Sequence, residues 1–411
     1  MMDALAAKSE PAEALTLLDA LARAPAAAAL VVAALERAED RKALRLVHPQ
    51  LRDAVGEATT KLEVRFDADA ATRPPTARRW PRLEELRLDT PDLAAIEALG
   101  SATWRALRSL SFGDQRGDIQ SALDAPAARA LAAALRQMPA LRALELWSVV
   151  LSDDAAAALF RAPSNGAVPQ LRALTLYFVE LMPAAARLLA ATGWRLEELN
   201  LFYNSSLGAA GLAPLLAAPT FALRRLDMVR CRLRAADILT VANASWPLEE
   251  LRLLQNDFSA AAAGPALAAL SRHARLRRLS VSYCELSAAG FKALVEAAWP
   301  ALLSFSAHAK VEFVGPHALG AAAFAGFPAI EELDLSDVKL GAAGAAVLAS
   351  RRWPRLRELT LICAQLSPAG AAARGVAGAR GAQPGRQRPR CAADPRGRAA
   401  LGARASAAVL A

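Results

Sequence analysis

The chain of 411 residues has few cysteines, histidines and tyrosines: four, four and three. The cysteines, at 231, 284, 363 and 391, lie far apart and have no histidine at metal-ligand spacing, so we expect reduced thiols rather than a zinc site or disulfide framework. No Gly-rich loop followed by Lys-Ser or Lys-Thr is present to cradle a phosphate. The sequence therefore predicts no cofactor, no metal ion, no catalytic residue and no enzymatic activity.

Long hydrophobic runs are also missing. The densest apolar block, APAAAALVVAAL at 24–35, is too short to span a bilayer. It follows acidic residues, whereas a secretory signal starts with basic ones. We expect a soluble cytoplasmic protein without a membrane partner, with the nucleus or a cytoskeletal or axonemal assembly as alternative locations.

Net positive charge is small in most of the chain. The formal net charge is +9, but residues 371–411 hold eight arginines against a single acid, Asp394. This leaves the first 370 residues nearly neutral, so no specific nucleic-acid binding is expected there. The tail has hardly any bulky apolar residue, and such a composition predicts disorder.

One short pattern recurs through the middle of the chain. It is written WPRLEELRLDT at 80–90, LRALELWSVV at 141–150, WRLEELNLFYN at 194–204 and WPRLRELTLIC at 353–363. If its first leucine-type residue is position 1, positions 4 and 6 are apolar in nearly every copy, and position 9 is Asn, Cys or a small apolar residue in eight of the copies. Eleven copies, about 27 residues apart, begin at Leu83, Leu107, Leu141, Leu171, Leu196, Leu223, Leu248, Leu276, Leu302, Ile330 and Leu356.

Each copy predicts a short strand, a small-residue turn and a helical run such as FKALVEAA at 291–298. Such a unit cannot bury its own leucines and needs a neighbour on each side. An Asn or Cys at position 9 is expected to satisfy backbone groups where the chain leaves the strand. Six of the seven tryptophans lie two or three residues before position 1, at the turn from helix to strand, and Trp147 is the exception.

This pattern resembles the leucine-rich repeat family, in its ribonuclease-inhibitor and cysteine-containing types, over residues 83–370. The resemblance implies an α/β solenoid shaped as a curved horseshoe, with parallel strands on the concave face and helices on the convex face. We predict a small helical segment at 10–60, a solenoid of about eleven repeats at 61–370 and a disordered tail at 371–411. The run KLEVRF at 61–66 alternates like a strand and is expected to cap the first repeat.

Candidate binding residues follow from the alternation of strand side chains. Positions 3, 5 and 7 are expected to face the concave surface, with position 8 beside them. All three tyrosines fall at position 7 or 8, and adjacent copies add a tryptophan and two phenylalanines. Because aromatic and arginine side chains often anchor interfaces, the predicted partner-binding residues are Trp147, Tyr177, Phe178, Phe202, Tyr203, Arg225, Arg230, Arg252 and Tyr283. The alternative is structural, since strands favour aromatic residues in any case.

The outward positions also carry charge in zones. Arginines mix with acids in the middle copies, and Glu332, Asp334, Asp337 and Glu358 make the last copies acidic. A surface with apolar, basic and acidic zones suits a folded protein or a peptide better than a nucleic-acid backbone, which needs one sign of charge. Of the histidines, only His308 falls on an outward strand position, and the repeat places no serine or cysteine nucleophile beside it.

The N-terminal run DRKALRLVHPQLRDAV at 40–55 resembles the second half of an F-box. The resemblance implies that Leu30, Leu35, Leu44, Val47 and Leu51 form a small helical core, part of which meets the adaptor subunit of a ubiquitin ligase. The opening Leu-Pro of that family is missing, and ARAPAAAA stands in its place. A helical cap on the solenoid would use the same leucines.

These observations favour a monomeric, non-catalytic protein that recognises another protein through its concave face. The resemblances imply a substrate receptor of an F-box type ubiquitin ligase. The alternatives are a structural scaffold, for example in a cytoskeletal or axonemal assembly, and a small-GTPase activator, although activators of this repeat class often have an acidic tail.

Overall fold

The computed structural model describes residues 59–65, 76–89, 92–114, 121–161, 170–309 and 319–364. The predicted helical segment with Leu30, Leu35, Leu44, Val47 and Leu51, and the predicted disordered tail, lie outside these ranges.

Parallel strands form one long sheet through the described residues. Each strand of this twelve-stranded sheet pairs with the next one along the chain, except that β4 and β6 leave it to pair with each other. The strands of the large sheet are β1 (Lys61–Arg65), β2 (Glu85–Asp89), β3 (Ser109–Gly113), β5 (Ala143–Trp147), β7 (Ala173–Tyr177), β8 (Glu198–Asn200), β9 (Arg225–Asp227), β10 (Glu250–Arg252), β11 (Arg278–Ser280), β12 (Ser304–Ser306), β13 (Glu332–Asp334) and β14 (Glu358–Thr360). The small sheet holds β4 (Ser121–Leu123) and β6 (Val149–Leu151).

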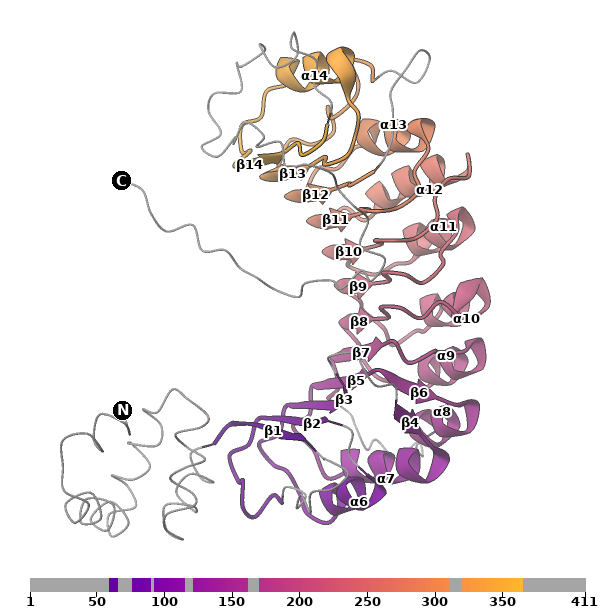
Figure 1. The fold of residues 1–411 in the computed structure, drawn as a ribbon, viewed down its shortest axis with the longest axis vertical. Helices are drawn as coiled ribbons and strands as arrows, with labels where there is room; N and C mark the ends of the chain where they lie inside the picture. Colours follow the sequence, from indigo (N-terminus) through magenta and orange to yellow (C-terminus); the bar gives the residue numbers. More distant parts are fainter. Residues whose placement is uncertain are drawn as a thin grey trace, which may run out of the picture.

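A helix follows most of these strands and lies on the outer side of the arc (Figure 1). The helices are α6 (Leu93–Gly100), α7 (Ala125–Leu135), α8 (Asp153–Phe160), α9 (Pro183–Ala190), α10 (Gly208–Leu216), α11 (Ala235–Asn243), α12 (Ala263–Ala269), α13 (Ala288–Glu296) and α14 (Gly341–Ser350), with a 3-10 turn at Leu270–Arg272. The strands line the inner, concave side of the same arc. The fold is the predicted α/β leucine-rich repeat solenoid, with β1 as the first strand before the eleven repeat strands.

Strand register aligns the same repeat position in every copy. Leu174 of β7 pairs with Leu199 of β8, which pairs with Leu226 of β9, and all three are position 4. Their side chains are buried, as are the position-6 residues Leu176 and Leu201. One continuous core therefore runs the length of the solenoid, and no repeat buries its leucines alone.

Tryptophans at the helix-to-strand turn serve the helix ends. The indole Nε1 of Trp104 donates to Leu99 O at 3.0 Å, and that of Trp299 donates to Leu294 O at 2.9 Å. These carbonyls belong to the last turn of a helix, where no helical N–H remains to pair them. The tryptophan therefore stabilises the end of the helix: its ring packs at the turn, and its indole N–H donates to a carbonyl that has no partner within the helix.

Position 9 carries an alternating row of Asn204, Cys231, Asn256 and Cys284, all buried. Asn204 Nδ2 donates to Leu176 O at 2.6 Å, and the Cys231 thiol lies 3.0 Å from Leu201 O. Each side chain thus reaches the position-6 carbonyl of the preceding repeat, and Asn256 and Cys284 do the same. Burial raises the pKa of Cys231 to about 12, so the thiol stays protonated and donates. The predicted role of position 9 is confirmed.

Position 8 adopts a left-handed backbone that the sequence did not predict. In eight copies a non-glycine residue has φ between 51° and 60° there: Ser148, Phe178, Tyr203, Arg230, Gln255, Tyr283, Asp337 and Cys363. Its N–H donates to the position-7 carbonyl of the next repeat, as from Tyr203 N to Val229 O at 2.8 Å. A left-handed residue costs about 1–3 kcal/mol, and this inter-repeat hydrogen bond together with the buried position 9 holds it in place.

Asn256→Ala tests the position-9 row. Asn256 Oδ1 accepts from Cys231 N and Leu233 N, and Nδ2 donates to Met228 O and Leu253 O. Truncation leaves several buried backbone groups unpaired at about 1–3 kcal/mol each, so we expect the free energy of unfolding to fall by at least about 3 kcal/mol in urea denaturation. Gln255→Ala, on an exposed neighbour, is the matched control with little expected change. Equal stability of both variants would contradict this role.

Candidate functional site

Five aromatic side chains gather on the concave face of β5, β7 and β8. Trp147, Tyr177 and Phe202, all at position 7, form an aromatic row: centroids lie 4.5 Å apart in each successive pair, with interplanar angles of 28° and 5°. Beside them Phe178 meets Tyr203 edge to face at 4.6 Å. We call these five residues the aromatic surface. The prediction that they lie together is confirmed.

The stacking decides which part of each ring faces outward. Because successive rings in the aromatic row cover each other's faces, the solvent side consists mainly of ring edges, which carry the positive end of the quadrupole. Trp147 Nε1 is held by Glu145 Oε2 at 2.9 Å. Burial raises the pKa of the Tyr177 hydroxyl, an effect that the nearby charge of Arg230 partly opposes. The surface is apolar, rigid and partly exposed, with Tyr203 at 36%.

Tyr283 does not belong to the aromatic surface. It lies after β11, is 57% exposed, and its ring contacts His308 edge to face at 5.0 Å. The repeat predicted its outward position correctly, but two copies lie between its copy and that of Tyr203. Any partner contact at Tyr283 is therefore a separate one.

The expectation that every position 7 faces outward is wrong in several copies. Val229, Ser282 and Ser336 are buried. In two of these copies the strand ends at position 5, where an aspartate Oδ1 accepts from the position-7 N–H: Asp227 from Val229 N and Asp334 from Ser336 N, each at 3.1 Å. Such a side-chain turn ends the extended backbone, so strict alternation stops at position 5. Among the described repeat strands, β2, β3, β5 and β7 extend to position 7, and the later ones end at position 5.

Most arginines in or directly before the strands form ion pairs within the chain. Arg225 Nη2 lies 2.6 Å from Glu198 Oε1, and Arg252 Nη1 lies 3.0 Å from Asp227 Oδ2. Burial raises the pKa of Asp227, and the charge of Arg252 opposes this rise. In-register neighbours of opposite sign form the further pairs Arg87–Glu63, Arg172–Glu197, Arg224–Glu249, Arg278–Glu250 and Arg357–Glu331. The predicted binding residues Arg225 and Arg252 thus also join adjacent strands.

Arg230 differs from the other two predicted arginines. Its guanidinium carbon lies 5.3 Å from the centroid of the Tyr203 ring, as in a cation–π contact. None of the ion pairs within the described ranges includes it. The structure therefore brings Arg230, but neither Arg225 nor Arg252, into ring contact with the aromatic surface.

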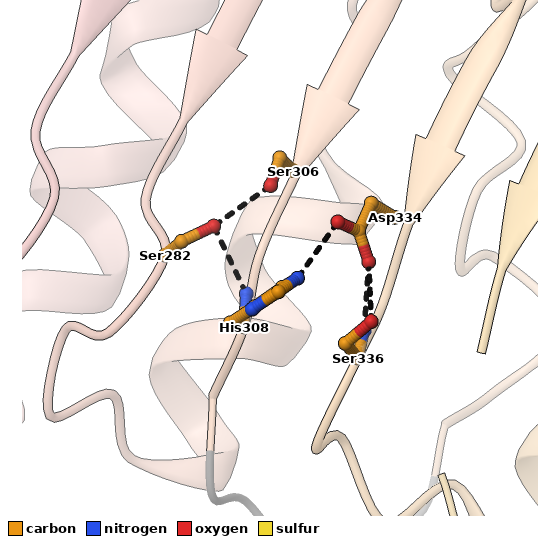
Figure 2. Close-up of polar contacts among 5 residues, drawn as sticks. All are labelled: Ser282, Ser306, His308, Asp334 and Ser336. Carbon is orange, nitrogen blue, oxygen red and sulfur yellow. Dashed lines mark hydrogen bonds and ion pairs between the residues drawn. The ribbon is translucent and has the colours of Figure 1, made fainter. Parts of the chain in front are cut away.

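A polar cluster, which the sequence did not predict, lies at β11–β13 (Figure 2). His308 Nε2 is 2.7 Å from Asp334 Oδ2, and the Ser336 hydroxyl donates to Asp334 Oδ1 at 2.7 Å. Ser282 Oγ and Ser306 Oγ are 2.7 Å apart. Burial raises the pKa of Asp334, but the hydrogen bonds from His308 and Ser336 outweigh this and hold it below its usual value. The expectation that the repeat places no serine beside His308 is wrong, because Ser282 is position 7 of the preceding copy and its hydroxyl lies 3.2 Å from His308 N. Repeat register was the available signal, since positions 5 and 7 of adjacent copies adjoin.

Serine, histidine and aspartate are also the residue types of a nucleophilic triad, so the geometry of the cluster decides whether it can act as one. A triad needs the serine hydroxyl on the ring nitrogen opposite the aspartate. Here Ser282 Oγ accepts from the backbone N–H of His308 at 3.2 Å, and His308 Nδ1 is buried without a hydrogen-bond partner. The cluster therefore orients side chains across three strands but does not activate a nucleophile.

Within the described ranges, no group of three or more His, Cys, Asp or Glu side chains is placed to hold a metal ion. Among the same residues, no helix combines the length and apolar character needed to cross a membrane.

Comparisons with known proteins add little to this picture. Neither a protein-family model nor a curated protein sequence matches the chain. A similar solved structure is the crystal structure of an internalin from Listeria monocytogenes, with 16% identity, a TM-score of 0.43, and coverage of 82% of this chain and 91% of that chain. The fold assignment rests on the strand order and register of this chain, not on that likeness.

The serine geometry makes a chemical prediction. A fluorophosphonate probe, which labels activated serines, is expected to leave Ser282 unmodified in the folded protein, because its hydroxyl is not bonded to the His308 ring. Peptide mass mapping of the treated full-length protein checks this, with a Ser282→Ala variant as the matched control. Labelling at Ser282 that His308→Ala abolishes would contradict the assignment and indicate an enzyme.

Proposed function

We propose that this protein is a non-catalytic recognition protein that binds a protein partner through the concave face of its solenoid, centred on the aromatic surface. The observation that carries the proposal is the grouping of Trp147, Tyr177, Phe178, Phe202 and Tyr203 over three adjacent strands. A contiguous apolar patch on an otherwise polar face is typical of a contact site.

The rigidity of the aromatic surface supports the same proposal. Stacked rings on paired strands lose little side-chain freedom when a partner binds, which lowers the entropic penalty of association. The surrounding charge is mostly paired within the chain, as in Arg225–Glu198 and Arg252–Asp227. A partner with a long run of one charge, such as a nucleic acid, gains little from such a face.

The double variant Trp147→Ala, Tyr203→Ala tests the site. Interface aromatics contribute about 2 kcal/mol or more each, so proteins captured by the wild-type chain should be lost. The variant also removes three ring pairs, each worth about 0.5–1.5 kcal/mol, so the protein should stay folded with a modestly lower melting temperature. Quantitative mass spectrometry of captured proteins and a thermal melt provide the two readouts.

The controls separate binding from folding. Leu239→Ala removes an exposed apolar side chain from α11 on the outer side and should preserve capture. Leu199→Ala truncates a buried core leucine and should lower the free energy of unfolding by about 2–5 kcal/mol. Unchanged capture by the Trp147, Tyr203 double variant would reject the site.

A role as substrate receptor of a ubiquitin ligase extends the proposal to residues 10–60, which lie outside the described ranges. It rests on the likeness of the run at 40–55 to an F-box. Full-length protein should then co-purify with the ligase adaptor, and Leu44→Asp with Val47→Asp should abolish this while leaving concave-face capture intact. If the wild-type chain recovers no adaptor, the scaffold role remains.

A further inference from the structure

One loop next to the aromatic surface carries arginines without a carboxylate partner in the described structure. The arginine loop, residues 229–234, follows β9 and alternates Arg230, Arg232 and Arg234 with Cys231 and Leu233. Cys231 and Leu233 are buried, whereas Arg232 and Arg234 are exposed and Arg230 is half-buried. The ion pairs within the described ranges include neither Arg230 nor Arg232, in contrast to the arginines of the strands.

The backbone of this loop is fixed from the next repeat. Arg230 and Arg232 both have left-handed backbones, with φ of 56° and 52°. Asn256 Oδ1 accepts from Cys231 N at 3.1 Å and from Leu233 N at 3.0 Å, on either side of Arg232. The Cys231 thiol lies 3.0 Å from Leu201 O. Three buried contacts therefore hold the left-handed backbone of the two arginines in place.

Arg230 also joins the arginine loop to the aromatic surface. Its guanidinium lies over the Tyr203 ring. Its positive charge also opposes the rise that burial causes in the pKa of the Tyr177 hydroxyl. A guanidinium whose face rests on a ring keeps its N–H edge for a carboxylate, which it binds through two parallel hydrogen bonds. Phe178 and Tyr203 stand beside it and provide an apolar contact.

We infer that the partner presents an acidic peptide segment, in which an Asp or Glu lies next to an apolar or aromatic side chain. The apolar side chain packs on Phe178 and Tyr203, and the carboxylate binds Arg230, with Arg232 adding positive charge. Charge complementarity is the reason for this choice, because the strand arginines are already paired with carboxylates of the chain. The inference rests on the proposed function and specifies the chemistry of its partner.

A phage-displayed library of random linear peptides, selected on immobilised full-length protein, tests the inference. Selected peptides should be enriched in Asp or Glu adjacent to an apolar or aromatic residue. A synthetic peptide of the selected sequence should bind Arg230→Gln, Arg232→Gln at least about tenfold more weakly, because hydrogen bonds to charged groups are lost. Arg187→Gln, which changes an exposed arginine of α9 on the outer side, is the matched control and should bind as the wild type does.

The outcomes distinguish the two proposals. Peptides that need Trp147 and Tyr203 but show no acidic preference would overturn the inference and leave the proposed function standing. If no selected peptide depends on Trp147 and Tyr203, both fail. Acidic peptides that bind Arg230→Gln, Arg232→Gln at full strength would overturn the inference as well. Thermal melts of each variant exclude loss of folding as the cause.

Discussion

In-register stacking of parallel strands is the constraint on which the rest of the structure depends. Each repeat contributes a short strand whose leucines can be buried only by the repeats before and after it. Register places like positions of neighbouring copies about 4.8 Å apart, so every repeat position becomes a continuous row along the sheet. Rows of leucine make the core, and the position-9 row of asparagine and cysteine satisfies the carbonyls where the strands end.

The same spacing governs the concave face. Neighbouring flat rings at that separation stack, as Tyr177 does on Phe202, and neighbouring charges of opposite sign pair, as Glu198 and Arg225 do. The last strands are the exception, because Glu332 and Glu358 are in-register neighbours of like charge. Most of the face is therefore satisfied within the chain. What distinguishes the proposed site is the remainder: ring edges turned to solvent, and the arginine loop. In that loop Arg230 contacts the Tyr203 ring, and the ion pairs within the described ranges include neither Arg230 nor Arg232. We propose that the partner binds at these remaining groups.

Much of this architecture could be predicted from the sequence, because a repeat fixes its own register. The apolar positions 4 and 6, the strand before the first repeat and the backbone role of Asn204 and Cys231 all follow from comparing copies. Position 7 could not be predicted in the same way. The strand continues through position 7 at Trp147 and Tyr177, but it ends at position 5 both with an aspartate turn, as at Asp227, and without an aspartate, as at Ser280. Periodicity alone gave no left-handed position 8 and no His308–Asp334 cluster.

Disulfide trapping across the concave face tests the register most directly. Ser280 of β11 and Ser306 of β12 are paired partners in the same row, whereas Ser304 lies two residues out of register with Ser280. With Cys363 and Cys391 replaced by serine, the account predicts that Ser280→Cys, Ser306→Cys forms a bond under mild oxidation. It also predicts that Ser280→Cys, Ser304→Cys does not, because its Cα atoms would lie about 8 Å apart, beyond disulfide reach. The reverse pattern, or a bond in neither variant, would contradict the stacked register.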